Sequence, residues 1–371
     1  MERTNAYSLL DFLDNSPCNF FATATIQRYL DANGFQELTQ SEGWILEKGG
    51  KYYVKKNDTA IFGFVIGETP LDQSGFNMIS AHSDSPCFRI KPNPEMLADG
   101  VLKLNTEVYG GPILYTWFDR PLSLAGRVIV RNPQNPARPI TKLIDFASPV
   151  LIIPHLAIHF NRNVNAGNPL SKQKDMLPIA AIVSDSMSKN NFLIDQIKER
   201  LEIADSKDIL DFDRMLYNYQ KSQLVGFNKE FICSGRIDDL SMAHAALSAL
   251  LNSDNPATTK VMAIFDNEET GSGTKQGAAS PVLASILHRV STCMGLDDEG
   301  FYQALSRSFL VSADNAHAAH PNYPEKYDPT NHPKMGGGPV IKINANCKYM
   351  TDAHSSAIFK EVCQAANVPC Q

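Results

Sequence analysis

The sequence predicts an α/β protein whose main domain is interrupted by a strand-rich insertion. Helical and β-rich segments alternate over residues 1–90 and again over residues 233–371, the pattern of a sheet layered with helices. Between them, residues 91–232 carry short apolar runs broken by Pro, Gly and Asn, which is typical of short strands. Acidic and histidine side chains end several apolar runs, where open α/β sheets place their functional sites.

The first part of the chain is expected to pack one helix on a group of strands. Ser16 and Pro17 form a typical helix start, and apolar residues keep helical spacing up to Gly34. Three β-rich runs follow, separated by turn-forming residues: KYYVKKN (51–57), TAIFGFVIG (59–67) and FNMISAHSD (76–84).

The insertion and the segment after it differ in predicted secondary structure. The insertion contains three β-rich runs, VLKLNTEVYGG (101–111), LAGRVIVRNP (124–133) and LIDFASPVLIIP (143–154), and one predicted helix, NNFLIDQIKERLEI (190–203). Strand and helix then alternate again in NKEFICSG (228–235), DDLSMAHAALSALLNS (238–253), KVMAIFDN (260–267) and SPVLASILHRVS (280–291). The main domain is therefore expected to be discontinuous, formed by residues 1–90 and 233–371.

Composition narrows the class of protein. Hydrophobic residues make up 43% of the chain and charged residues 20%, as in soluble globular proteins. The net charge of -6 provides no basic surface for a nucleic acid, and no apolar stretch is long enough to span a membrane. The first residues lack a secretory signal, so we expect a cytoplasmic protein. The seven cysteines form no Cys-x-x-Cys pair, which argues against a zinc knuckle.

His82 and Asp84 are the first candidate site, in the sequence AHSDSP (81–86) at the end of a predicted strand. An aspartate in this position can accept the second N–H of the imidazole, which leaves the other ring nitrogen free to bind a metal. The alternative is a strand-end histidine that is merely hydrogen-bonded.

Two acidic clusters offer further ligands. Asp238 and Asp239 open a predicted helix, where the alternative is helix capping, and His244 on that helix is expected to pack rather than bind a metal. Asp266, Glu268 and Glu269 end the run VMAIFDNEE (261–269), where the alternative is a solvated acidic turn. Neighbouring acids of an extended chain point to opposite sides, so one can bind a metal while the next reaches a water.

Histidines accompany two other apolar runs. Asp314 ends the run FLVSAD (309–314), with His317 and His320 beyond it. His155 and His159 lie within the insertion, where the residues alone favour satisfied core histidines.

Together, one histidine and several carboxylates at separate strand ends favour a divalent-metal site, with zinc first and manganese or cobalt second. A free glutamate beside two bridged metals is suited to hydrolysis of an acyl bond. The chain has no G-x-S-x-G motif, phosphate-binding loop or dinucleotide fingerprint.

The chain resembles the M18 aminopeptidases, the aspartyl aminopeptidase family, over essentially its whole length. The resemblance is carried by seven motifs in family order: AHSDSP, TWFDRPLSLAGRV, IPHLAIHFNRN, GRIDDL, FDNEETGS, SADNAHAAHPNY and GPVIKINANCKYMTD. It implies a phosphorylase/hydrolase-like zinc peptidase domain, formed by residues 1–90 and 233–371. It also implies an inserted dimerisation domain over residues 91–232 and a homo-oligomer, commonly a dodecamer built from dimers.

The resemblance also implies roles for individual residues. His82, Asp238 and Asp314 match the ligands of one zinc ion, with Asp238 bridging to a second ion that Glu269 also binds. Glu268 matches the general base, and Asp84 matches the aspartate that orients His82. His317, Lys342 and Tyr349 match positions near the substrate, whereas His159 matches a histidine that reaches into a neighbouring subunit's active site. The implied reaction releases an N-terminal residue, often Asp or Glu, from a peptide.

Two departures from the family pattern lead to further expectations. Asp239 stands where the family usually has Asn, so an extra carboxylate is expected to raise the pKa of a neighbour or to change metal affinity. The family continues past the position of Gln371 with a Met-His-Ser motif whose histidine completes the second metal site. We therefore expect an incomplete second site and fewer than two tightly held metal ions per chain.

Two alternatives to an active aminopeptidase are considered. One is a truncated, catalytically impaired assembly or binding subunit that keeps the dimerisation surface. The other is a metal-dependent carboxypeptidase or deacylase, which would share the ligands but not the motifs of the insertion.

Overall fold

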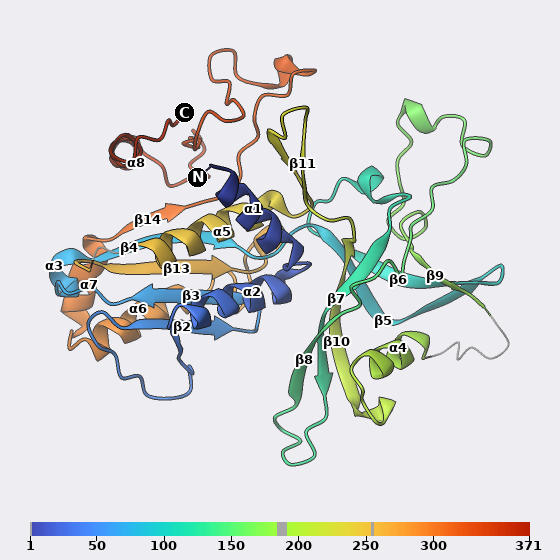
Figure 1. Cartoon of the computed structure of the whole chain (residues 1–371), viewed down its shortest axis with the longest axis horizontal. Coiled ribbons are helices and arrows are strands. Elements are labelled where there is room, and N and C mark those ends of the chain that lie inside the picture. Colours follow the sequence, from blue (N-terminus) through green and yellow to red (C-terminus); the bar gives the residue numbers. More distant parts are fainter. Residues whose placement is uncertain (1, 184–190, 254–255) are drawn as a thin grey trace. The chain divides into compact units, whose positions relative to one another are not determined.

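The computed structural model describes residues 2–183, 191–253 and 256–371. The chain divides into two compact units, Met1–Ala313 and Asp314–Gln371. Figure 1 shows the elements of both units in sequence colours. Position 190, the first of the helix predicted in the insertion, lies outside the described residues.

The first unit contains a six-stranded sheet of mixed direction. Its strand order is β1-β2-β3-β13-β4-β14. Strand β4 is parallel to both β13 and β14, whereas β3 is antiparallel to β2 and β13. The strands span Gln36–Glu37 (β1), Lys51–Lys56 (β2), Ala60–Val65 (β3), Phe76–His82 (β4), Thr259–Phe265 (β13) and Phe309–Ser312 (β14).

Helices cover both faces of this sheet because its central strands are apolar on both sides. Ile61 and Met262 pack into one core with residues of α1, α2 and α5, whereas Phe62 and Val261 pack into a second core with residues of α6 and α7. Successive strand side chains point to opposite faces, so such two-sided strands bury both. The helices span Glu2–Asp14 (α1), Asn19–Ala32 (α2), Leu71–Ser74 (α3), Ile237–Asn252 (α5), Val282–Cys293 (α6) and Asp298–Ser306 (α7).

The start of α2 differs from the sequence expectation. The helix begins at Asn19 with Cys18 as its N-cap, instead of at Ser16 and Pro17. The backbone N–H of Ser16 donates to Leu13 O, so Ser16 completes the end of α1, a helix that the sequence analysis did not predict. No helix in the described part of the chain is both long and apolar enough to cross a membrane.

A second six-stranded sheet is formed by most of the strands that lie in sequence between β4 and β13 of the first sheet. Its order is β8-β7-β10-β5-β6-β9, and every pairing is antiparallel. Helix α4 (Phe192–Arg200) buries Leu193 and Ile197 in the core of this sheet with Phe88 and Leu216. The strands span Cys87–Ala98 (β5), Val101–Tyr109 (β6), Leu122–Val130 (β7), Ile140–Asp145 (β8), Ile179–Ile182 (β9) and Ile209–Asn218 (β10).

The two sheets are joined within the first unit by apolar packing and hydrogen bonds. Cys18, the N-cap of α2, and Phe20 of α2 form a core with Ala125 and Met215 of the second sheet. Arg127 Nη1 donates to Asn57 O over 3.2 Å. The chain returns to the first sheet through a two-stranded sheet of β11 (Gln223–Val225) and β12 (Phe231–Cys233). The proposed boundaries at 90/91 and 232/233, and the dimerising role of the insertion, stay predictions.

The second unit, Asp314–Gln371, has one regular helix and long irregular segments. Helix α8 (Ala353–Ala365) begins with a capping box, in which the Asp352 carboxylate accepts from Ser355 N and the Ser355 hydroxyl accepts from Asp352 N. Gln371 holds the loop before α8, because its carbonyl accepts from Ile341 N and its N–H donates to Pro339 O.

Candidate metal centre

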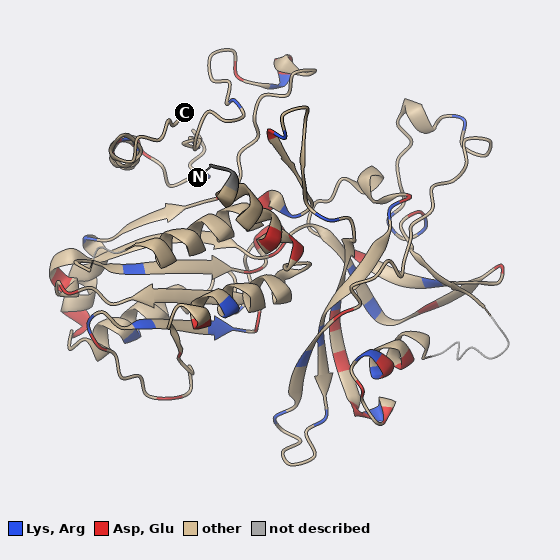
Figure 2. Cartoon of the chain, in the orientation of Figure 1, with Lys and Arg blue, Asp and Glu red and all other residues tan. Residues whose placement is uncertain are grey.

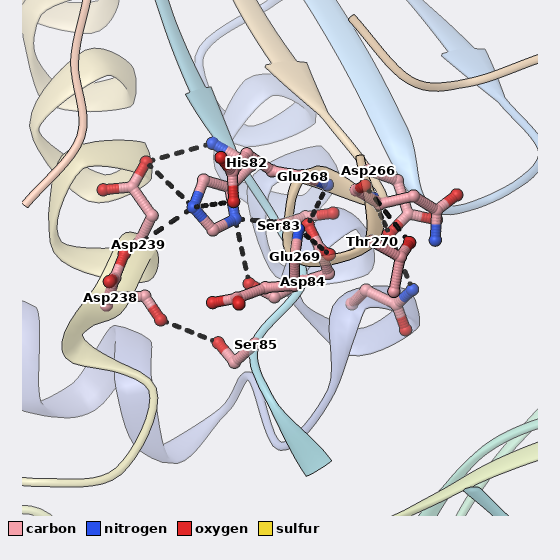
Figure 3. A network of polar contacts seen from close by, with 12 residues as sticks. His82, Ser83, Asp84, Ser85, Asp238, Asp239, Asp266, Glu268, Glu269 and Thr270 are labelled. Carbon is pink, nitrogen blue, oxygen red and sulfur yellow. Dashed lines mark hydrogen bonds and ion pairs between the residues drawn. The ribbon is translucent and has the colours of Figure 1, made fainter. Parts of the chain in front are cut away.

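Two strand ends and one helix start meet at one edge of the first sheet. β4 ends at His82 and β13 at Phe265, and these two residues are paired in parallel register. The turn that follows β13 carries Glu268 and Glu269. Figure 2 shows acidic residues at the start of α5, and Figure 3 shows carboxylates gathered around His82. Because parallel strands end at the same edge of a sheet, distant acidic motifs meet there.

One ring nitrogen of His82 is hydrogen-bonded to Asp84, and the other faces the carboxylates of Asp238 and Glu268. The side chain is buried, and Nδ1 lies 3.1 Å from Asp84 Oδ1 and 3.0 Å from Asp84 O. Nε2 lies 3.6 Å from Asp238 Oδ1 and 3.8 Å from Glu268 Oε2. The Asp84 contact favours a proton on Nδ1, which leaves Nε2 as a possible metal ligand. The structure thus brings the predicted pair into hydrogen-bond contact, and its role in metal binding stays a prediction.

The electrostatic environment of His82 favours positive charge. Burial lowers the pKa of His82, but hydrogen bonding to Asp238 and Asp84 and the charge of Asp239 outweigh burial and raise the pKa to about 11. Carboxylates gathered around one buried imidazole are stabilised by a cation at their centre, either a proton or a metal ion.

Asp84 is a buried hydrogen-bond acceptor that connects three segments. Besides His82, it accepts the Tyr109 hydroxyl over 2.6 Å and the backbone N–H groups of Glu268 and Glu269 over 3.2 Å each. Burial raises the pKa of Asp84, but the bonds from His82 and Tyr109 hold it below its usual value. Tyr109 ends β6 of the second sheet, and Asn267 Nδ2 donates to its hydroxyl over 2.8 Å. Sequence reasoning missed Tyr109, since no local pattern links it to a strand of another sheet.

Asp238 and Asp239 precede the regular part of α5. Both have non-helical backbone angles, so they form an irregular entry to the helix. Asp239 is fully buried and its Oδ2 accepts the backbone N–H of His82 over 3.1 Å. Ser85 Oγ donates to Asp238 O over 2.9 Å. The extra carboxylate at position 239 thus lies directly beside His82, 4.0 Å from Nε2.

The three acids after β13 have different surroundings. Asp266 is buried and accepts from Asn19 Nδ2 over 3.0 Å, so it supports the turn instead of facing His82. The Glu268 side chain is about half exposed, with its carboxylate beside His82. Burial and the charges of Asp238, Asp84 and Glu268 raise the pKa of Glu269 to about 7, against the opposing charge of His82.

These donors fit a divalent metal ion. Ligand atoms of His82, Asp238 and Asp239 lie within 4.8 Å of one another, and so do those of His82, Glu268 and Glu269. One imidazole nitrogen with several carboxylate oxygens is the mixed donor set that suits zinc, and also manganese. The predicted neighbours from separate motifs are thus brought together at the edge of the first sheet.

Other predicted site residues lie in the second unit and are described there by themselves. Lys342 Nζ donates to Asp314 Oδ2 over 2.7 Å and to Asn315 O over 2.9 Å. It also lies 5.8 Å from the centre of the Tyr349 ring. Asp314, Lys342 and Tyr349 therefore form one group, whereas His317 is exposed in an irregular segment.

The remaining histidines separate into packed and exposed side chains. His244 packs against Phe12, with ring centres 5.4 Å apart, and its Nε2 lies 2.9 Å from Ser8 Oγ, which matches the expected packing role. His155 contacts the Phe118 ring. His159 is exposed, so its interpretation as a core histidine is wrong, and its role toward a neighbouring subunit stays a prediction.

Comparison with known proteins identifies the family of the chain. The family model for the aminopeptidase I zinc metalloproteases (M18) matches residues 12–371. A probable M18 family aminopeptidase 2 from Clostridium novyi (strain NT) is 51% identical over 99% of this chain and 84% of the relative. One from Pseudomonas aeruginosa (strain UCBPP-PA14) is 41% identical over 98% of this chain and 83% of the relative.

Solved structures share the fold of this chain. An Ape4 chain in a cryo-EM structure of the Ape4 and Nbr1 complex is 35% identical with a TM-score of 0.93, covering 100% of this chain and 74% of the other. The M18 aminopeptidase from Thermotoga maritima shares the fold, with a TM-score of 0.85 at 24% identity over 100% of this chain and 83% of the other. These comparisons do not favour a carboxypeptidase, a deacylase or an inactive binding subunit. The chain belongs to the M18 family of metal-dependent aminopeptidases, which the family model describes as zinc enzymes.

Proposed function

We propose that this aminopeptidase hydrolyses peptides with a two-zinc site. In this proposal His82, Asp238 and Asp314 hold one ion, and Asp238 also reaches a second ion that Glu269 binds. The observation that supports it most is the convergence of Asp238 and Glu268 on His82 Nε2, at 3.6 and 3.8 Å. Manganese or cobalt could occupy the same mixed donor set.

The parallel pairing of β14 with β4 continues to the last residue of the first unit, because Ala313 donates its backbone N–H to Ser80 O. The assignment of Asp314, the next residue, to this ligand set rests on the resemblance to the M18 aminopeptidases.

Different residues have different roles in the proposed hydrolysis. Zinc at this site would polarise the scissile carbonyl and lower the pKa of a water molecule. Glu268 accepts the proton of the attacking water and passes it to the leaving amine, since its half-exposed carboxylate lies beside His82 and, unlike that of Asp238, is not assigned to a metal ion. Asp84 keeps the His82 ring oriented and, through the N–H groups of Glu268 and Glu269, holds the turn that carries the base.

We propose that the substrate is a peptide with an acidic N-terminal residue. Lys342 supports this specificity because it already binds a carboxylate, that of Asp314, over 2.7 Å. A substrate carboxylate would compete for the same ammonium group. Hydrolysis of the anilides of Asp, Glu and Leu by the zinc-loaded protein should therefore favour Asp and Glu, and a preference for Leu would exclude acidic specificity.

Glu268→Gln tests the proposed base. We expect kcat on an aminoacyl anilide to fall by about 100-fold or more, because the amide accepts no proton from water. Zinc content should stay unchanged, since Glu268 is not among the proposed ligands. Glu299→Gln, an exposed glutamate of α7, is the matched control and should keep full activity. Activity of Glu268→Gln above a tenth of the wild-type value would exclude Glu268 as the base.

Zinc titration tests the two ions separately. We expect one ion that survives dialysis and a second that is lost more easily, since an imidazole takes part only in the first ligand set and zinc binds nitrogen donors well. A chelator should abolish activity, and added zinc should restore it. Two equally tight ions per chain would contradict this order of affinity.

We further propose that the chain forms a homo-oligomer in which His159 reaches a neighbour's active site. A solved mature Ape1 from yeast, which has this fold, is described as a dodecamer. His159 is exposed and lies on the irregular segment that follows the β-bridge between Ile153 and Phe118. Its imidazole is therefore accessible to a second copy of the chain. The oligomer would thus be needed for a complete active site.

A further inference from the structure

A cavity of about 480 Å³ lies where the two sheets of the first unit meet. It is lined by the segment before α2, the loop after β4, and the ends of β6 and β10. This volume is in the range of cavities that hold small molecules. Asp84 belongs to the wall, whereas His82 and Glu268 are not among the described residues that line the cavity. The cavity therefore adjoins the candidate metal centre at Asp84 without including His82.

The buried part of the wall offers apolar contacts. Cys18, Cys87 and Met215 line it and are almost fully buried. Burial raises the pKa of the Cys18 thiol to about 12, and burial likewise raises that of Cys87, so both thiols are neutral. The polar groups in this part already have partners, since Tyr109 donates to Asp84 and Tyr217 donates to Asp145 Oδ1 over 2.7 Å.

The wall also carries cationic side chains, of which Arg120 and Lys221 are exposed and Arg236 is largely buried. Arg120, Lys221 and Arg236 line the cavity, against one carboxylate, Asp84, whose oxygens already accept several hydrogen bonds. Arg236 donates to the carbonyls of Ser16 and Leu13, and Lys221 lies 3.8 Å from Asp14. Within the described part of the chain, the side chain of Arg120 has no hydrogen bond or ion pair. The exposed Arg120 is thus the cation available to a ligand.

We propose that this cavity binds a small carboxylic acid with an aromatic or aliphatic body. The body packs against Met215, the two thiols and Trp117, and the carboxylate pairs with Arg120 at the exposed side. A cavity with buried apolar side chains and an exposed arginine is complementary to such an amphipathic anion. The cavity shares Asp84 and Tyr109 with the surroundings of His82, but Arg120 and Trp117, which contact the proposed ligand, are not assigned to the peptidase reaction.

Trp117 allows binding to be measured directly. The chain has two tryptophans, and Trp117 lines the cavity whereas Trp44 is buried in the core beneath α6 and α7. Titration of the full chain with 4-phenylbutyrate should change tryptophan fluorescence in a saturable way, with a dissociation constant on the order of 1 mM or below. Calorimetry should give the same constant. Trp117→Phe should remove the fluorescence change.

Charge recognition is tested with the neutral amide of the same probe. We expect 4-phenylbutanamide to bind about tenfold more weakly than the acid, since it forms no charge-assisted bond. Arg120→Gln should remove this preference, whereas Arg138→Gln, an exposed arginine in the loop between β7 and β8, should keep it.

Several outcomes would overturn the proposal. These are the absence of saturable binding in calorimetry, equal affinity of the acid and the amide for the wild-type chain, and an unchanged preference in Arg120→Gln. Circular dichroism of each variant checks its folding. Because the measurement needs neither substrate nor zinc, failure here leaves the proposed peptidase function untouched, and the reverse also holds.

Discussion

At the scale of single residues, Asp84 connects the parts of the candidate metal centre by hydrogen bonds. It receives the His82 ring, the Tyr109 hydroxyl and two backbone N–H groups of the turn after β13. A buried carboxylate with several donors is held in one position, and it holds its partners in turn. The Tyr109 hydroxyl therefore connects the second sheet to the candidate metal centre.

Removal of this hydroxyl should weaken zinc binding. Tyr109→Phe keeps the ring but leaves Asp84 Oδ2 without its shortest hydrogen bond and Asn267 without an acceptor. We expect zinc affinity, measured by competition with a chelating dye, to fall by about tenfold, since outer hydrogen bonds orient metal ligands. Tyr217→Phe is the matched control, because its hydroxyl also lies in the cavity wall but bonds Asp145. Equal zinc affinity in both variants would show that Tyr109 does not position the site.

At the scale of elements, β10 carries an unusual core residue. Arg214 is fully buried within the second sheet, and Nε, Nη1 and Nη2 have no hydrogen-bond partner among the described residues. Its guanidinium carbon lies 4.3 Å from the centre of the Phe212 ring. Burial lowers the pKa of Arg214 to about 9. A charge taken out of water without a partner destabilises the fold.

Arg214→Leu should therefore stabilise the protein. We expect the free energy of unfolding near pH 7 to rise by about 1–4 kcal/mol. The folded-state pKa lies below the unfolded one, so the unfolded chain binds more protons, and the destabilisation is fully present below pH 9 and declines as pH rises above it. The advantage of the variant should shrink accordingly.

Denaturant unfolding of wild type and variant at pH 7.5 and pH 10 checks this sign. Arg138→Leu, at an exposed position, should change stability little at either pH. A destabilised Arg214→Leu would mean that the arginine has a partner that matters for stability.

At the scale of the whole molecule, the proposed oligomer makes a prediction about shared active sites. If His159 acts in a neighbour's site, Glu268→Gln and His159→Ala are defects of different chains in the same active site. Each variant alone should be inactive, and co-expression should restore activity to about a quarter of the sites by random pairing. Mixed chains that stay at the level of the two single variants would show that His159 acts within its own chain or has no catalytic part.

Much of the fold and of the site could be predicted because the signals are local. Runs of apolar and β-favouring residues marked β3, β4 and β13, and their position at strand ends marked His82, Glu268 and Glu269 as candidates. The start of α2 could not be predicted, because Ser16 has the chemistry of an N-cap but its N–H completes α1. His159 was misjudged from the residues for a related reason, since an apolar neighbourhood in sequence does not ensure burial.

The sequence by itself determined which residues could do the chemistry, since residue type and strand-end position are properties of a short segment. Only the tertiary structure decided which of them meet: that Asp239 is buried against His82, that Asp266 supports the turn, and that Tyr109 of another sheet reaches Asp84. Pairing of β4 with β13 joins positions far apart in the chain, and such long-range register depends on packing of the whole sheet.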